Sequence, residues 1–127
     1  MKKKILIVDD EPDVRFTIKD DLEDEYNIDE VENGLMCLEY LSNNSKPDLI
    51  LLDIMMPEMN GWKTIEQIRD NKSWRNIPII FLTARTDDVA KIGGDFLGED
   101  YIEKPYNLTD LKQRIEKVLN TPHKSIL

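Results

Sequence analysis

Apolar residues along the chain follow two alternating patterns. Three segments are almost continuously apolar and rich in Ile, Leu and Val, which is typical of strands buried on both faces of a sheet; they are residues 3–9, 47–53 and 77–83. Two shorter segments, residues 26–34 and 100–105, predict further strands. The segments between them space their apolar residues as amphipathic helices do; they are residues 12–24, 35–44, 62–71, 87–98 and 108–119.

The helical segments differ in how clearly they are specified. Pro12 suits the first position of a helix, with Asp10 or Glu11 as its cap. The segment 87–98 contains Gly93 and Gly94, each of which costs roughly 1 kcal/mol relative to alanine, so we expect a loose helix there. The residues expected to face the core are Val14, Ile18 and Leu22, then Leu35, Leu38 and Leu41, and finally Leu108, Leu111, Ile115, Val118 and Leu119.

The regular alternation of strand and helix predicts an α/β fold, a doubly wound parallel sheet with helices on both faces. The 127 residues are the length of one domain, which we place at residues 1–120, followed by a flexible tail at 121–127. In such sheets, ligands bind beyond the carboxyl ends of the strands. The residues at the strand ends are therefore the first candidates for a functional site.

Charge and composition exclude several classes of function. Residues 1–60 hold 16 acidic and 6 basic side chains, a net charge of −10, whereas residues 61–127 hold 10 and 11, a net charge of +1. This balance argues against direct binding to nucleic acid and favours a cation or a basic partner. The single cysteine, Cys37, and the single histidine, His123, cannot form a zinc cluster or a histidine-based triad. With no apolar run of membrane-spanning length, we expect a soluble, cytoplasmic protein, with Cys37 a buried free thiol.

Five polar side chains follow the predicted strands. Asp9 and Asp10 end the first strand, Asp53 the third, Thr83 the fourth and Lys104 the fifth. Carboxylates that crowd together repel one another unless a cation holds them, and hard oxygen ligands suit Mg²⁺. One carboxylate could then attack phosphorus while the metal and the lysine neutralise the transferring oxygens and a hydroxyl donates to another. The product would be an aspartyl phosphate.

These five residues and the segments around them resemble the receiver domain of two-component response regulators. The segments are "KILIVDDEPDVR", "PDLILLDIMMPEMNGW", "IPIIFLTA" and "DYIEKPY". The resemblance implies a flavodoxin-like, five-stranded sheet in the order 2-1-3-4-5. It also implies that Asp53 accepts a phosphoryl group from a phosphohistidine on a sensor histidine kinase or a histidine phosphotransfer protein. Asp9, Asp10 and Asp53 would hold Mg²⁺ with the backbone carbonyl of Met55, while Thr83 and Lys104 contact the phosphoryl group.

The resemblance carries further expectations. Thr83 and Tyr101 would change position when Asp53 is phosphorylated. This change would reshape the surface that binds a downstream target or a missing output domain. Met55 and Arg85 match positions that flank the attacking water, from which we predict a long-lived phosphoaspartate. The Lys104–Pro105 bond matches one that is usually cis. The domain would be a phosphoacceptor signalling module and not an enzyme, although it assists its own phosphorylation and dephosphorylation.

Other classes of protein use similar sets of residues. A haloacid-dehalogenase-like phosphatase places its nucleophile and acid two residues apart after the first strand, unlike the adjacent Asp9 and Asp10, and a flavodoxin-like cofactor carrier needs a phosphate loop that "DDEPD" would repel. A protein-interaction module that is never phosphorylated remains the main alternative. Pro57 and Gly61 are turn residues under any of these hypotheses. The acidic residues between positions 11 and 25 indicate a solvated helix face and turn, with partner docking as the lesser alternative.

Overall fold

The computed structural model describes residues 2–54, 61–83 and 100–120 of the chain. Five parallel strands form one sheet in the order β2-β1-β3-β4-β5. The strands are β1 (Lys4–Val8), β2 (Asn27–Val31), β3 (Leu49–Asp53), β4 (Ile79–Thr83) and β5 (Asp100–Glu103). The described helices are α1 (Pro12–Leu22), α2 (Gly34–Asn43), α3 (Gly61–Asp70) and α5 (Leu108–Asn120). The fold class and strand order predicted above are confirmed.

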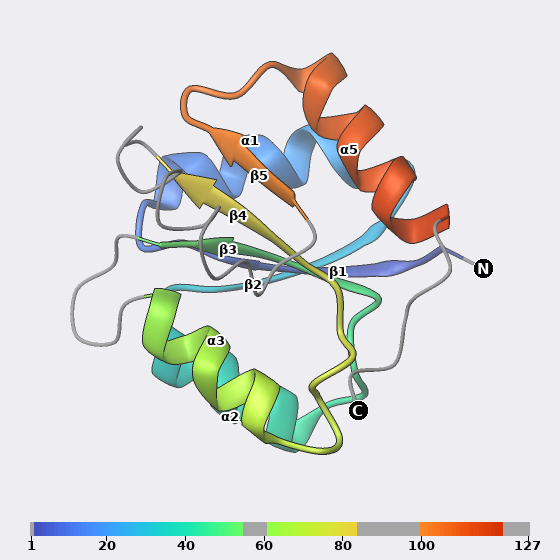
Figure 1. The fold of residues 1–127 in the computed structure, drawn as a ribbon. Helices are drawn as coiled ribbons and strands as arrows, with labels where there is room; N and C mark the ends of the chain where they lie inside the picture. The colour runs from blue at the N-terminus through green and yellow to red at the C-terminus, as the bar shows by residue number, and fades with distance from the viewer. Residues whose placement is uncertain (1, 55–60, 84–99, 121–127) are drawn as a thin grey trace.

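The helices cover the sheet in two layers, with α1 and α5 on one face and α2 and α3 on the other (Figure 1). Alternate residues of β1 point to opposite faces of the sheet. Leu6 and Val8 pack into the core beneath α2 and α3, and Ile5 and Ile7 pack into the core beneath α1 and α5. Burying both faces of a strand requires a continuous apolar run, and this is the pattern seen in the sequence. None of the helices in the described part of the chain is long and apolar enough to cross a membrane.

The prediction for the buried face of α2 is wrong in one position. Leu35 is 49% exposed, whereas Gly34, Cys37 and Leu41 are buried. The helix begins at Gly34, where the Asn33 side chain accepts a hydrogen bond from the Met36 backbone N–H at 2.9 Å. Steps of three residues fall short of a 3.6-residue turn, so Leu35 lies about 120° around the helix axis from Leu41.

The helix expected at residues 87–98, with Gly93 and Gly94, lies outside the described residues, as do Met55, Pro57, Arg85 and the tail at 121–127. In α5, Leu111 and Ile115 are buried as expected, but Leu108 at the first position is exposed. Cys37 is buried, which raises the pKa of its thiol to about 12. Such a thiol stays protonated and acts as a small apolar side chain.

Candidate functional site

Three carboxylates meet at the carboxyl end of the sheet. Asp9 follows β1 and Asp53 ends β3, and the two strands are parallel neighbours with Val8 beside Leu52. Asp10 is the next residue along the chain. One oxygen from each of the three side chains lies within 4.8 Å of the other two, with Asp9 and Asp53 buried and Asp10 half-buried. Asp9 and Asp53, 44 positions apart in the sequence, therefore lie in one cluster because the two strands run in the same direction.

Lys104 reaches this cluster from the segment that follows β5. Its Nζ lies 2.7 Å from Asp9 Oδ2, 3.4 Å from Asp53 Oδ2 and 3.9 Å from Glu11 Oε1. The Lys104 backbone N–H donates to the carbonyl oxygen of Thr83 at 2.7 Å, which places the lysine at the end of β4. The Lys104–Pro105 peptide bond is cis.

Burial alone would lower the pKa of Lys104, but its close contact with Asp9 and the charges of Asp53, Asp9 and Glu11 outweigh this effect and raise the pKa. The lysine is therefore a fixed positive charge at neutral pH. A single ammonium faces three clustered carboxylates, which leaves two negative charges that the lysine does not balance.

The donor set of the cluster fits a divalent cation. Asp9 Oδ1 accepts a hydrogen bond from the Glu11 backbone N–H at 2.9 Å. Asp9 Oδ2 is buried and accepts no regular hydrogen bond from the residues that the structure describes, although Lys104 lies beside it as an ion pair. A buried carboxylate oxygen with spare acceptor capacity, next to two further carboxylates, is the hard oxygen environment that Mg²⁺ prefers.

Thr83 and Tyr101 occupy the strands on the Lys104 side of the cluster. Thr83 is the last residue of β4 and is fully buried, one position beyond the Leu82 that pairs with Asp53. Tyr101 lies in β5 beside Phe81 and packs in part against the core beneath α2 and α3. The guanidinium of Arg114 lies 5.9 Å from the centre of the Tyr101 ring, and its Nη1 donates to the Tyr101 carbonyl oxygen at 3.1 Å. The structure thus places the expected switch residues on adjacent strands.

Two residues near the cluster were not singled out as functional from the sequence. Arg15 in α1 donates from Nη1 to the Asp9 carbonyl oxygen at 2.7 Å and pairs through Nε with Glu30 at 3.1 Å. A cation six residues after Asp9 in an otherwise acidic stretch is the one sequence signal that could have indicated it. The contact fixes the backbone that carries Asp9 and Asp10.

The sequence predicts an ordinary turn residue at Gly61, but in the structure Gly61 lies against the backbone of Asp53 and Ile54. Its N–H donates to the Ile54 carbonyl oxygen at 2.8 Å. A Cβ atom at this position would lie 2.7 Å from both the Asp53 carbonyl oxygen and the Ile54 Cα. Real Cβ atoms do not approach backbone this closely, so glycine is required for α3 to begin beside the end of β3.

Comparisons with known proteins give a consistent result. The sequence model described as "Response regulator receiver domain" matches residues 5–116. Among curated proteins, the chain is 40% identical over 127 residues to "Response regulator ArlR" of Staphylococcus saprophyticus, covering 98% of this chain and 56% of that protein. It is 39% identical over 119 residues to "Histidine kinase P4" of Formosa agariphila, covering 93% of this chain and 9% of that protein. The chain thus spans about half the length of one relative and less than a tenth of the other.

Solved structures show the same likeness in three dimensions. The signal receiver domain of a signal transduction histidine kinase from Syntrophus aciditrophicus is 31% identical and superposes with a TM-score of 0.84, covering 98% of this chain and 97% of that one. Sequence and structure comparisons therefore agree over nearly the whole chain.

Proposed function

Because the chain belongs to the family of response regulator receiver domains of two-component systems, we propose that it accepts a phosphoryl group on Asp53 in a Mg²⁺-dependent reaction. The donor is a phosphohistidine on a sensor histidine kinase or a histidine phosphotransfer protein. The observation that carries the proposal is the position of the Lys104 ammonium, 3.4 Å from Asp53 and 2.7 Å from Asp9 within the carboxylate cluster.

Asp53 is the nucleophile in this proposal. One of its carboxylate oxygens forms a bond to phosphorus as the phosphorus–nitrogen bond of the donor breaks, and the electron pair of that bond stays with the departing imidazole. Lys104 already lies beside the reacting carboxylate, so it neutralises charge on the transferring oxygens with little rearrangement. Thr83, buried at the adjacent strand end, supplies a hydroxyl donor to the phosphoryl group.

Asp9, Asp10 and Asp53 are the side chains that would hold Mg²⁺, together with the Met55 carbonyl that the family resemblance implies. When bound, Mg²⁺ neutralises negative charge on the phosphoryl oxygens. Asp9 is held for this role through its Oδ1 contact to the Glu11 N–H and through the Arg15 contact to its carbonyl. The protein therefore supplies an ordered set of oxygen ligands before any cation arrives.

The chain is a phosphoacceptor in this scheme and does not act as an enzyme on a separate substrate. Phosphorylation biases Thr83 and Tyr101 toward a second arrangement, and the surface around β5 and α5 then binds a target protein or an output domain. Met55 and Arg85 tune the lifetime of the phosphoaspartate, which we expect to be long because an apolar side chain cannot orient the attacking water. These assignments follow from the family resemblance and stay predictions.

Intact-mass measurement tests the proposal directly. The chain is incubated with acetyl phosphate in the presence of Mg²⁺ or of a chelator, beside Asp53→Asn and the matched variant Asp48→Asn. Asp48 lies just before the other end of β3, where it accepts a hydrogen bond from the Lys4 N–H at 2.8 Å. We expect one phosphoryl adduct on the intact protein and on Asp48→Asn, and none on Asp53→Asn or without metal. If the protein without substitutions takes no phosphoryl adduct, the chain is an interaction module that is not phosphorylated.

A further inference from the structure

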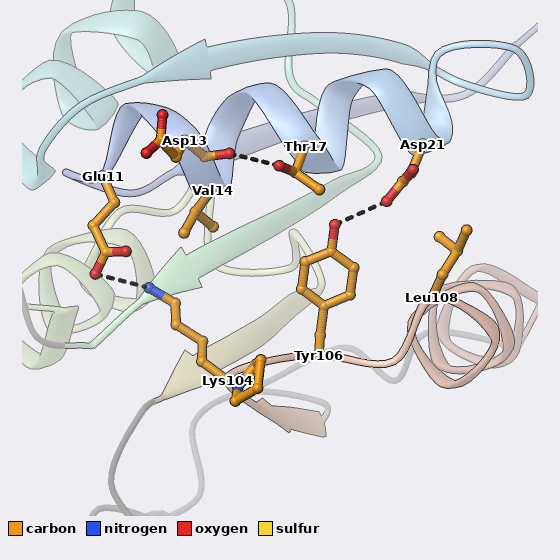
Figure 2. Close-up of a pocket in the computed structure, with 9 residues that line it drawn as sticks. Glu11, Asp13, Val14, Thr17, Asp21, Lys104, Tyr106 and Leu108 are labelled. Carbon is orange, nitrogen blue, oxygen red and sulfur yellow. Dashed lines mark hydrogen bonds and ion pairs between the residues drawn. The ribbon is translucent and has the colours of Figure 1, made fainter.

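The segment after β5 that carries Lys104 faces α1 across a cavity of about 660 Å³. Figure 2 shows α1 as one wall, with Glu11, Thr17 and Asp21 along it, and Lys104 and Tyr106 reaching toward it from the other side. The space between the two walls means that close packing against α1 does not by itself hold this segment in place. Its position depends on the contacts at its ends.

Two polar contacts join the segment to α1, one at each end of the helix. The Lys104 ammonium lies 3.9 Å from Glu11, the residue at the N-cap position of α1, whose side chain makes no capping hydrogen bond. The Tyr106 hydroxyl donates to Asp21 Oδ2, in the last turn of α1, at 2.9 Å. Asp21 lies ten positions after Glu11, a rise of about 15 Å along the helix axis. The segment is thus attached to α1 at both ends of the cavity.

The Tyr106 side chain is suited to act as a fixed donor. Its ring is partly buried and packs against the core beneath α1 and α5. Burial, followed by the hydrogen bond to Asp21 and the charge of Asp21, raises the pKa of Tyr106, so the hydroxyl stays protonated. Asp21 is half-buried, and therefore does not belong to a fully solvated acidic face as the sequence had indicated.

Apart from the ion pairs of the Lys104 ammonium with Asp9 and Asp53, the remaining contacts of the segment with described residues lie in its backbone and in the cap of α5. Upstream, the Lys104 N–H donates to the Thr83 carbonyl oxygen at 2.7 Å. Downstream, the Asn107 side chain accepts from the Asp110 N–H at 3.0 Å and caps α5. Among the described residues, the hydroxyl of Tyr106 makes the hydrogen bond that ties the stretch between these two points to α1.

We propose that Tyr106 and Asp21 are positioning residues for Lys104. Their hydrogen bond fixes the segment two residues beyond the lysine, and so sets where the ammonium lies between Asp9 and Asp53. The inference rests on the proposed phosphorylation of Asp53 for its consequence, because an ammonium that drifts away from Asp53 no longer neutralises the transferring oxygens. The geometry of Lys104 itself can be observed without any phosphoryl donor.

A purely structural role would predict something different. If the hydrogen bond only stabilised the packing of α1 against α5, its loss would lower the free energy of unfolding and leave Lys104 where it is. A second Tyr–Asp pair provides the matched control, because Tyr40 in α2 donates to Asp29 in β2, at the opposite edge of the sheet from β5. Tyr40→Phe removes the same kind of bond far from Lys104.

The experiment follows the ε-methylene resonances of lysine in ¹H–¹³C spectra of the metal-free protein, with the Lys104 signal identified by its absence in Lys104→Met. Tyr106→Phe keeps the aromatic ring, so a shift of the Lys104 signal reports displacement and not loss of the ring. We expect that shift in Tyr106→Phe and Asp21→Ala, and not in Tyr40→Phe. Asp21→Asn keeps an acceptor oxygen and should restore the signal toward its original position.

The same variants are then phosphorylated with acetyl phosphate and Mg²⁺. Tyr106→Phe and Asp21→Ala should react about fivefold more slowly, the effect of one net hydrogen bond, while Asp21→Asn and Tyr40→Phe stay close to the unmodified rate. A folded Tyr106→Phe protein with an unmoved Lys104 signal, or with an unchanged rate, would overturn the proposal. If the unmodified chain takes no phosphoryl group, the proposed function fails, and the Lys104 signal still decides separately whether the pair positions the lysine.

Discussion

Replacing Lys104 by methionine tests how the carboxylate cluster is stabilised. Methionine has a similar length but no charge, so Asp9 and Asp53 lose the ammonium that lies 2.7 and 3.4 Å from them. At an effective dielectric constant of 20, each contact is an attraction of about 5–6 kcal/mol, which the desolvation of the lysine offsets in part. Removing one partner of a buried ion pair costs about 3–5 kcal/mol. We expect the free energy of unfolding to fall by about 3 kcal/mol in the absence of metal.

Magnesium should reverse much of this loss. The ammonium and a bound cation repel each other across the same carboxylates, so Mg²⁺ should bind Lys104→Met more tightly than the unmodified protein. A cation present at 100 times its dissociation constant stabilises the folded state by about 2.7 kcal/mol. The difference in stability between the two proteins should therefore narrow as Mg²⁺ is added.

Urea denaturation at pH 7.5, with Mg²⁺ or with a chelator, measures both effects. The raised pKa of Lys104 means that its contribution is fully present below the pKa of an unfolded lysine, about 10.4, and is lost only as the pH rises through the folded value. The control is Lys112→Met, which removes the exposed pair with Glu25 at 3.1 Å and should cost less than about 1 kcal/mol with no response to Mg²⁺. A loss for Lys104→Met that is small, or that Mg²⁺ leaves unchanged, would refute the reasoning.

Two further predictions follow from backbone packing and from burial. Gly61→Ala places a Cβ atom 2.7 Å from the Asp53 carbonyl oxygen, which cannot move aside as a side chain does, so we expect a loss of about 1–3 kcal/mol in urea denaturation and weaker Mg²⁺ binding; an unchanged midpoint and affinity would contradict this. Burial raises the pKa of the Cys37 thiol to about 12, so the stability it contributes is present below its unfolded pKa of about 9 and is lost as the pH rises toward 12. At neutral pH the thiol should react with a disulfide reagent only as fast as the chain opens, and rapid labelling of the folded protein would show the prediction to be wrong.

The fold could be predicted from the sequence because the central strands, which are buried on both faces, are continuously apolar. Residues 5–8, 49–52 and 79–82 are apolar at every position, and only a strand covered on both faces needs such a run. Helix faces are specified less sharply, since a helix rich in leucine offers more than one apolar stripe. In α2 the start at Gly34 selected the stripe through Cys37 and Leu41, and Leu35 was left exposed.

The candidate site could be assembled from the sequence for a related reason. Parallel strands bring their carboxyl ends to one edge, so Asp9, Asp53 and Lys104 had to lie near one another once the strands were known. Their exact partners could not be predicted in this way. Lys104 lies closer to Asp9 than to Asp53, because its position depends on the segment after β5 and not on the order of the strands.

The acidic face of α1 includes contacts that the composition of the helix does not predict. Charged residues along a helix are usually solvated, and most of those in α1 are exposed. Asp21 differs because the direction of α1 carries its last turn over the segment after β5, where Tyr106, 85 residues later, meets it. Arg15, nearer the start of the same helix, reaches the carbonyl of Asp9. One contact runs from α1 to a member of the carboxylate cluster and the other to the segment that carries Lys104. Neither partner could be read from the composition of α1, because the folded geometry alone brings these residues together.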